Sequence, residues 1–134
     1  MAGASILVDY ILTVAVSISA VTRCWSSGDI VLSRYTLSAV AGTAVTLTTG
    51  NDQITVDANL NLPGVNVTLN PSGTSESVVF STASSINANL LTLGGTRFTD
   101  FNSGAGAVNL NTPVTMNQEA QFNSGTVNLS GAAT

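Results

Sequence analysis

The side chains that most often carry out catalysis are scarce in this sequence. It has no His and no Lys, and its one Cys, Cys24, stands beside Trp25. Nucleophilic catalysis needs a Ser, Thr or Cys with an activating base nearby, and those pairs are missing here. Chemistry by two carboxylates remains open, and the candidates are Asp52, Asp57, Glu76, Asp100 and Glu119. They are scattered as turn residues would be, so we expect no enzyme, no catalytic residue and no cofactor.

One acidic stretch has the composition of a calcium-binding turn. Gly50-Asn51-Asp52-Gln53-Ile54 resembles one unit of the calcium-binding nonapeptide repeats of secreted bacterial toxins. The resemblance implies an oxygen ligand from Asp52, and Asp57 could add another. Ca²⁺ takes about 6–8 oxygen ligands, so several consecutive units are needed, and here the unit stands alone. We expect a plain turn, with Asp52 and Asp57 as the candidate metal ligands.

Two segments fit the pattern for N-glycosylation, Asn66-Val67-Thr68 and Asn128-Leu129-Ser130. The pattern Asn-x-Ser/Thr is short and arises by chance in a chain rich in Asn and Thr. If Val67 and Val127 face the core, alternation along a strand turns Asn66 and Asn128 outward. Both are therefore candidate modification sites.

The overall charge excludes one class of partner. Charged residues make up 7% of the chain, against roughly 25% in a typical soluble domain, and the net charge is −4. The only cations are Arg23, Arg34 and Arg97. Nucleic acid binding needs several Lys or Arg on one face, so we expect no nucleic acid partner. Because Cys24 is alone, no disulfide can form within the chain.

A short phrase recurs between Thr43 and Ser130: an apolar residue, Thr or Asn, and a second apolar residue. The first residues of its copies are separated by 22, 24, 17 and 19 positions. A repeat of about 20 residues that contains a strand indicates a solenoid or an array. The copies are Val45-Thr46-Leu47-Thr48, Val67-Thr68-Leu69-Asn70, Leu91-Thr92-Leu93-Gly94, Val108-Asn109-Leu110-Asn111 and Val127-Asn128-Leu129-Ser130.

The fold class that follows is mainly β, with a β-solenoid-like body over 29–134. No stretch after Val21 keeps the helical spacing of apolar residues, whereas alternation is clear from Val45 onward. A β-sandwich or jelly roll is the alternative, because it also contains many short alternating strands. Only a solenoid explains why one phrase recurs, since each turn stacks like residues in register. The uneven spacing of the copies counts against it.

The first residues form a separate segment, which we predict to be a hydrophobic helix over 1–22. Between Ala2 and Val21 the only charge is Asp9, and about 20 apolar residues can span a bilayer. Three interpretations stay open. The segment is a cleaved signal with a small-residue site at Ser17-Ile18-Ser19, a membrane contact through 2–21, or a helix buried between subunits. The stretch 3–17 also resembles one membrane helix of bacterial amino-acid permeases, a resemblance that implies no transport by a chain with one such segment.

The Thr residues of the phrase suggest a further activity. Thr46, Thr68, Thr92 and Thr115 would form an outward column, and flat Thr ladders on β-solenoids resemble those of ice-binding proteins. Asn109 and Asn128 are expected to interrupt this column. Ice binding is therefore a minor alternative.

The body also resembles the strand repeats of bacterial β-solenoid adhesins and autotransporter passenger regions. The residues that carry this resemblance are Phe101-Asn102-Ser103-Gly104 and Phe122-Asn123-Ser124-Gly125, each followed by Val-Asn-Leu. The resemblance implies an extracellular or cell-surface protein with a structural or adhesive role and no catalysis.

Self-assembly is the function that these features favour together. No polar cap follows the last strand before Thr134, and few charges are available to protect strand edges from pairing with another chain. We expect a homo-oligomer, joined through the N-terminal helix and the β edges, as a subunit of an extracellular, pilus-like filament or surface layer. The alternative is a monomeric adhesin or virion surface protein that binds glycan or a host protein.

Overall fold

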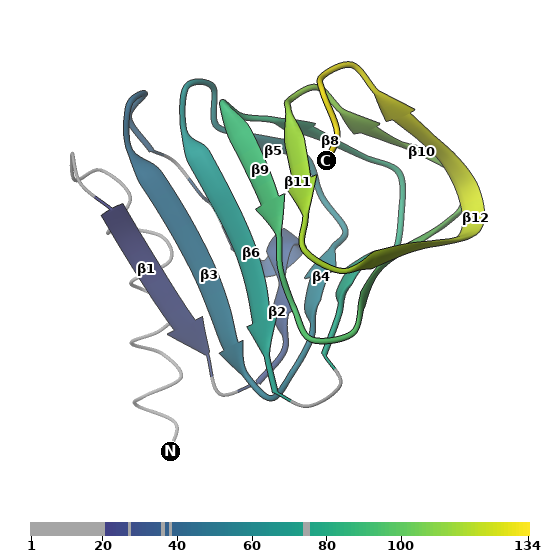
Figure 1. Cartoon of the computed structure of the whole chain (residues 1–134), viewed down its shortest axis with the longest axis horizontal. Helices are drawn as coiled ribbons and strands as arrows, with labels where there is room; N and C mark the ends of the chain where they lie inside the picture. Colours follow the sequence, from purple (N-terminus) through teal and green to yellow (C-terminus); the bar gives the residue numbers. More distant parts are fainter. Residues whose placement is uncertain (1–20, 27, 36, 38, 74–75) are drawn as a thin grey trace.

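The chain winds into a β-solenoid. The computed structural model describes residues 21–26, 28–35, 37, 39–73 and 76–134, with side chains from Gly28 onward. Within them the backbone makes about 4 turns around one core, and every pair of neighbouring strands is parallel (Figure 1). The predicted β-solenoid is therefore confirmed, and the β-sandwich alternative is wrong.

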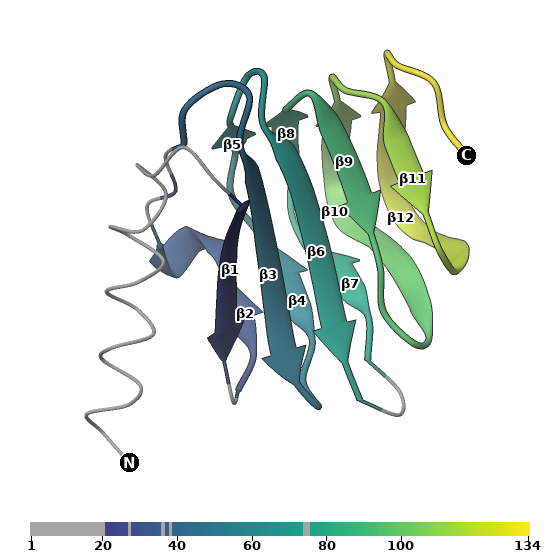
Figure 2. The ribbon, with the colours of Figure 1, turned by 60° about the vertical axis from the view of Figure 1, so that its left-hand side comes forward.

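One sheet forms the first face of the solenoid. Its strands stack in the order β1, β3, β6, β9, β11, one from each successive turn (Figure 2). These strands are Val21–Ser26 (β1), Ala44–Gly50 (β3), Asn66–Ser72 (β6), Leu90–Leu93 (β9) and Val114–Met116 (β11).

The second sheet bends around a corner and so supplies two further faces. Its two longest strands, Phe98–Leu110 (β10) and Glu119–Leu129 (β12), run through the corner and pair with each other. The second face holds Ile30–Val31 (β2), Ile54–Val56 (β4), Val78–Phe80 (β7) and the first halves of β10 and β12. The third face holds Leu60–Asn61 (β5), Ser84–Asn87 (β8) and the second halves of β10 and β12. A short 3-10 helix, Leu32–Arg34 (η2), follows β2.

Strict alternation of apolar and polar residues builds the core. In β3 the buried positions are Val45, Leu47 and Thr49, and the residues between them are half-buried. Successive side chains of a strand point to opposite faces of the sheet, so every second residue enters the interior. Because the strands are parallel and in register, these residues stack as columns, one of which is Val45, Val67, Leu91 and Val114.

The register also explains the uneven spacing of the repeated phrase. The first-face column runs from Val45 to Val67, Leu91 and Val114, at nearly even steps of 22, 24 and 23 residues. The copies at Val108 and Val127 lie on the third face instead, where Val108 pairs with both Ser84 and Val127. The phrase therefore occurs on two faces, and each face has its own spacing.

The predicted N-terminal helix over 1–22 falls almost entirely outside the described residues. Only its last two residues are described, and these, Val21 and Thr22, begin strand β1 and pair with Ala44 and Val45. The β body therefore begins before residue 29. The strand at Val21 pairs in parallel with β3 like every later turn on this face.

Candidate functional site

The Thr residues of the first face form an uninterrupted column. Thr46 pairs with Thr68, Thr68 with Thr92, and Thr92 with Thr115. Each is half-buried and points away from the core, and the Oγ1 atoms of Thr115 and Thr134 lie 3.3 Å apart, which extends the column by one turn. The predicted column is thus confirmed, whereas its predicted interruption is wrong: Asn109 pairs with Ser85 and Asn128 on the third face.

The neighbouring column of the first face has a different composition. Thr48 is followed by Asn70, and the next turn places Gly94 against it, with the Gly94 amide donating to the Leu69 carbonyl at 2.8 Å. A Cβ on Gly94 would come 2.5 Å from Oδ1 of Asn70. The regular Thr surface is therefore one residue wide.

Side-chain amides bridge successive turns along the third face and its corners. Asn87 donates through Nδ2 to Oδ1 of Asn61 at 2.9 Å, and Asn128 does the same to Asn109 at 2.8 Å. At the corner before the first face, Asn89 donates to Asn66 at 2.7 Å. An amide has both donor and acceptor atoms, so one residue can bond to the turn below and the turn above. These exposed bonds fix the register of stacked turns.

The two candidate calcium ligands lie at opposite ends of β4. Asp52 precedes the strand and Asp57 follows it, with Gln53 and the three residues of β4 between them. The Asp57 carboxylate accepts hydrogen bonds from the Ser33 amide at 2.8 Å and from Ser33 Oγ at 2.6 Å. Among the described residues no cluster of three acidic, His or Cys side chains could hold a metal ion. The structure therefore does not bring the candidates together, and it gives Asp57 a structural role.

Both candidate glycosylation residues are exposed, as alternation predicts. Asn66 opens β6 and its Oδ1 accepts the bond from Asn89, while Asn128 lies near the end of β12. Val67 is buried beneath the first of them, and Val127 is half-buried beneath the second. Their placement permits modification, which remains a prediction.

The last turn of the solenoid presents an open strand edge. Strand β12 pairs with β10 along one side, and no other described strand pairs with its outer side. The outer edge of β11 is different, because Ala132 and Thr134 exchange backbone hydrogen bonds with Val114 and Met116. An unpaired edge exposes a row of backbone N–H and C=O groups that can template another strand.

Apolar side chains accompany this edge. Phe122 is the last member of an aromatic stack in which Phe80 and Phe101 lie 4.9 Å apart and Phe101 and Phe122 lie 5.2 Å apart. Phe80 and Phe101 are buried, but Phe122 is 66% exposed. Leu129 ends the column of Leu60, Ile86 and Leu110 on the third face and is 47% exposed. Two inner columns therefore continue to the surface at β12.

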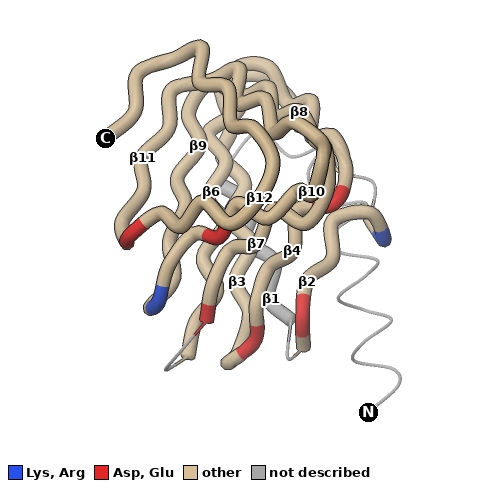
Figure 3. The backbone as a smooth tube through the Cα atoms, turned by 90° about the vertical axis from the view of Figure 1, so that its right-hand side faces the viewer, with Lys and Arg blue, Asp and Glu red and all other residues tan. Residues whose placement is uncertain are grey.

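The charged residues lie elsewhere. Those of the described residues after Gly28 lie on the strands of the second face or just before and after them, and they leave most of β12 and the whole of β8, β9 and β11 without charge (Figure 3). Glu119, the first residue of β12, is its only charged side chain. Lys residues and inward charges are the usual protection of an edge strand, and the rest of β12 has neither. This open edge, with Phe122 and Leu129, is the candidate functional site.

Exposed strand edges are expected from the sequence in general, but the sequence does not single out these two residues. Phe122 and Leu129 look like core positions, since they occupy the same places in the repeat as Phe101 and Leu110. They differ from Phe101 and Leu110 because β12 has no described neighbour on its outer side. Recognising this requires the order in which the strands stack.

The membrane interpretation of residues 2–21 is not tested by the structure. In the part of the chain that the structure describes, no helix is long and apolar enough to cross a bilayer. The hydrophobic segment lies outside that part except for Val21.

Comparison with known proteins assigns no family. No family model, no curated protein and no solved structure matches the sequence. The resemblance to β-solenoid adhesins is thus supported at the level of the fold alone, and no relative supports the resemblance to permeases.

Proposed function

We propose that this chain is an extracellular structural protein that assembles with copies of itself into a filament or surface layer. The observation that carries the proposal is the open edge of β12, where two inner columns end in exposed Phe122 and Leu129. Burying such side chains contributes roughly 1.5–3 kcal/mol each. Pairing the strand edge adds backbone hydrogen bonds.

The low charge of the molecule supports association further. A net charge of −4 on 134 residues gives little repulsion between copies, and β12 has one charged residue, Glu119. Stacked amides such as the pair Asn128 and Asn109 could continue into the next copy, because an amide can bond to turns on both sides. A solenoid is extended by adding turns, and each turn needs contact with its neighbours only.

Sedimentation and negative-stain imaging of the full chain test this proposal. We expect concentration-dependent association in buffer without detergent, and fibres or sheets in the images. A chain that stays strictly monomeric, with residues 2–21 intact, would contradict the proposal. The alternative is a monomeric adhesin or virion surface protein. It predicts a chain that stays monomeric and binds a glycan or a host protein.

The Thr column supports ice binding as a second candidate function. Thr46, Thr68, Thr92 and Thr115 repeat at the spacing of parallel strands, about 4.8 Å. Their hydroxyl and methyl groups form a regular row that could order water. Thermal hysteresis of the purified protein measures this activity, and its loss in Thr68→Tyr would assign it to the column. No hysteresis in the unaltered protein removes the candidate.

A further inference from the structure

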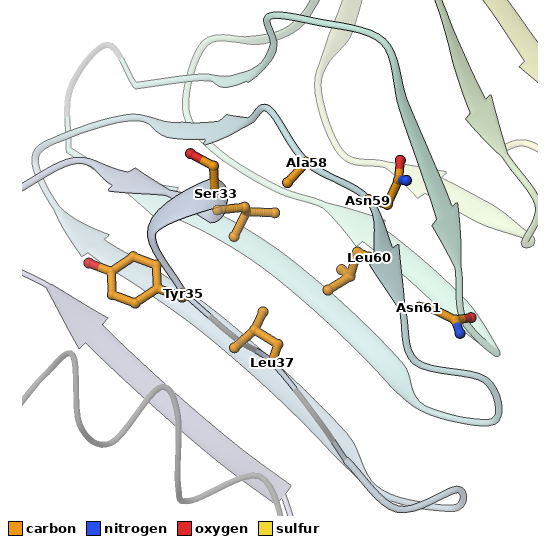
Figure 4. A pocket seen from close by; sticks show the side chains of 8 residues that line it. Ser33, Tyr35, Leu37, Ala58, Asn59, Leu60 and Asn61 are labelled. Atoms are coloured by element: carbon orange, nitrogen blue, oxygen red, sulfur yellow. The ribbon is translucent and has the colours of Figure 1, made fainter.

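The opposite end of the solenoid holds a pocket of about 270 Å³. It lies between the segment that follows β2 and the edge of β5, and Figure 4 shows Tyr35 and Leu37 on one side with Leu60 on the other. Strand β5 pairs with β8 alone among the described strands. The pocket therefore lies along the side of β5 with which no other described strand pairs.

The wall of this pocket is held in place. Ser33 donates through its amide and its hydroxyl to the Asp57 carboxylate, at 2.8 and 2.6 Å, which ties η2 to the end of β4. None of the described side chains that line the pocket carries a charge. Its size is sufficient for an apolar side chain, since an apolar cavity of about 150 Å³ can hold a benzene molecule.

Two of its lining residues, Leu60 and Leu32, lie where the two columns that end at the open edge begin. Leu60 begins the column of Ile86, Leu110 and Leu129. Val31 pairs with Thr55, so the next residue, Leu32, lies level with Val56. Val56 begins the column that continues through Phe80, Phe101 and Phe122. One end of the molecule thus offers a pocket at the start of the same two columns whose last side chains protrude at the other end.

We propose that Phe122 and Leu129 of one copy dock against the pocket that Tyr35, Leu37 and β5 line in a second copy. This inference rests on the proposed self-assembly and specifies its geometry. Different surfaces of the two copies meet, so the contact is head-to-tail and the pair keeps one free pocket and one free edge. A head-to-tail contact that does not close into a ring builds an open chain of subunits, in which the inner columns continue from copy to copy.

Variants that block one surface each provide the test, made in the full chain and measured by sedimentation. Leu37→Asp places a charge in the pocket and leaves β12 intact, whereas Phe122→Asp blocks β12 and leaves the pocket intact. Ala58→Arg is a second pocket variant, which guards against a folding defect at Leu37, and circular dichroism checks the β content of each. Val40→Asp is the matched control, because Val40 is 54% exposed and lies outside both surfaces.

We expect each blocked variant to be monomeric alone and an equimolar mixture of Leu37→Asp and Phe122→Asp to form dimers that grow no further. Only one intact edge and one intact pocket meet in such a mixture. Val40→Asp should assemble like the unaltered chain. If the unaltered chain assembles and folded Leu37→Asp and Ala58→Arg assemble equally well, the pocket is not the contact and only the proposed function stands. A mixture without dimers also overturns the head-to-tail contact, and a monomeric unaltered chain overturns both proposals.

Discussion

Two hydroxyl groups in the interior lack hydrogen-bond partners among the described residues, Oγ1 of Thr99 and Oγ of Ser84. Thr99 is fully buried on the second face, in a column where earlier turns place Ile54 and Val78. A buried hydroxyl without a partner costs roughly 1–3 kcal/mol of stability. The column itself is apolar, so at this residue the repeat departs from its own pattern.

Replacing Thr99 by Val should therefore stabilise the protein. The two side chains have nearly the same shape, and Val removes the unpaired hydroxyl, so we expect a gain of about 1 kcal/mol in the free energy of unfolding. Urea denaturation measures it. Thr49→Val is the matched control, because Thr49 is equally buried but bonds to the Asp52 carbonyl and the Ser72 amide. Thr49→Val should lower the free energy of unfolding by about 1–3 kcal/mol. If Thr99→Val also lowered it, the Thr99 hydroxyl would have a hydrogen-bond partner.

Gly64 marks a corner where the backbone leaves no room for a side chain. Its φ is +76°, and a Cβ would come 2.7 Å from Cβ of Ala41. We expect Gly64→Ala to destabilise the fold by about 2–3 kcal/mol, as strain in φ and a steric clash add. Gly104 has a φ of +68° with open space around it, so Gly104→Ala should show the strain alone, about 1 kcal/mol. Equal losses in thermal or urea unfolding would contradict the clash.

At the scale of elements, the aromatic stack joins three successive turns of the second face. Phe101 lies between Phe80 and Phe122 and is 1% exposed. Phe101→Ala should reduce the free energy of unfolding by about 3–5 kcal/mol, because it opens a cavity inside the stack. Phe122→Ala removes a side chain that is largely solvated in the single molecule, so below the association concentration it should cost less than about 1 kcal/mol. Similar costs at low concentration would mean that Phe122 is buried in the monomer.

The sequence was sufficient to predict the strands, but not which strands lie on the same face of the solenoid. Alternation at Val45–Thr48 and the recurrence of its pattern were sufficient to predict stacked parallel strands and an outward Thr column, because strand periodicity and repetition are local properties. The assignment of each copy to a face was not local. Val108-Asn109-Leu110 looks like Val67-Thr68-Leu69 in sequence, yet it lies on another face, since the corners between strands vary in length.

The corner within β10 and β12 shows the same effect at finer detail. The matching Phe-Asn-Ser-Gly segments suggest that Ser103 and Ser124 are equivalent, but the register pairs Phe101 with Phe122 and then Asn102 with Ser124. Ser124 Oγ donates to Oδ1 of Asn102 at 2.7 Å and accepts from the Gly104 amide at 2.9 Å. The longer corner of β10 absorbs the difference between the two turns. Side-chain bonding across turns, not sequence identity, decides the pairing there.

At the scale of the whole molecule, the forces that hold the turns together and those that would join two copies are the same. Backbone hydrogen bonds, apolar columns and neutral amide ladders do both. Among the described residues, charged groups contribute mainly at the corners, where for example the backbone N–H of Gln53 donates to Oδ1 of Asp29 at 3.1 Å. On the outer side of β12, no other described strand continues the stack. Assembly therefore requires no interaction that the fold does not already use.

This equivalence predicts how association responds to salt. Screening at 1 M NaCl shortens the Debye length to about 3 Å and removes the attraction between exposed opposite charges. An interface of Phe122, Leu129 and strand edges has no such attraction to lose, while the weak repulsion from a net charge of −4 disappears. The dissociation constant should therefore stay the same or fall between 20 mM and 1 M NaCl, and fall further in sodium sulfate, which strengthens apolar burial. Sedimentation equilibrium measures it, and a tenfold weakening in NaCl would place charged groups at the contact instead of β12.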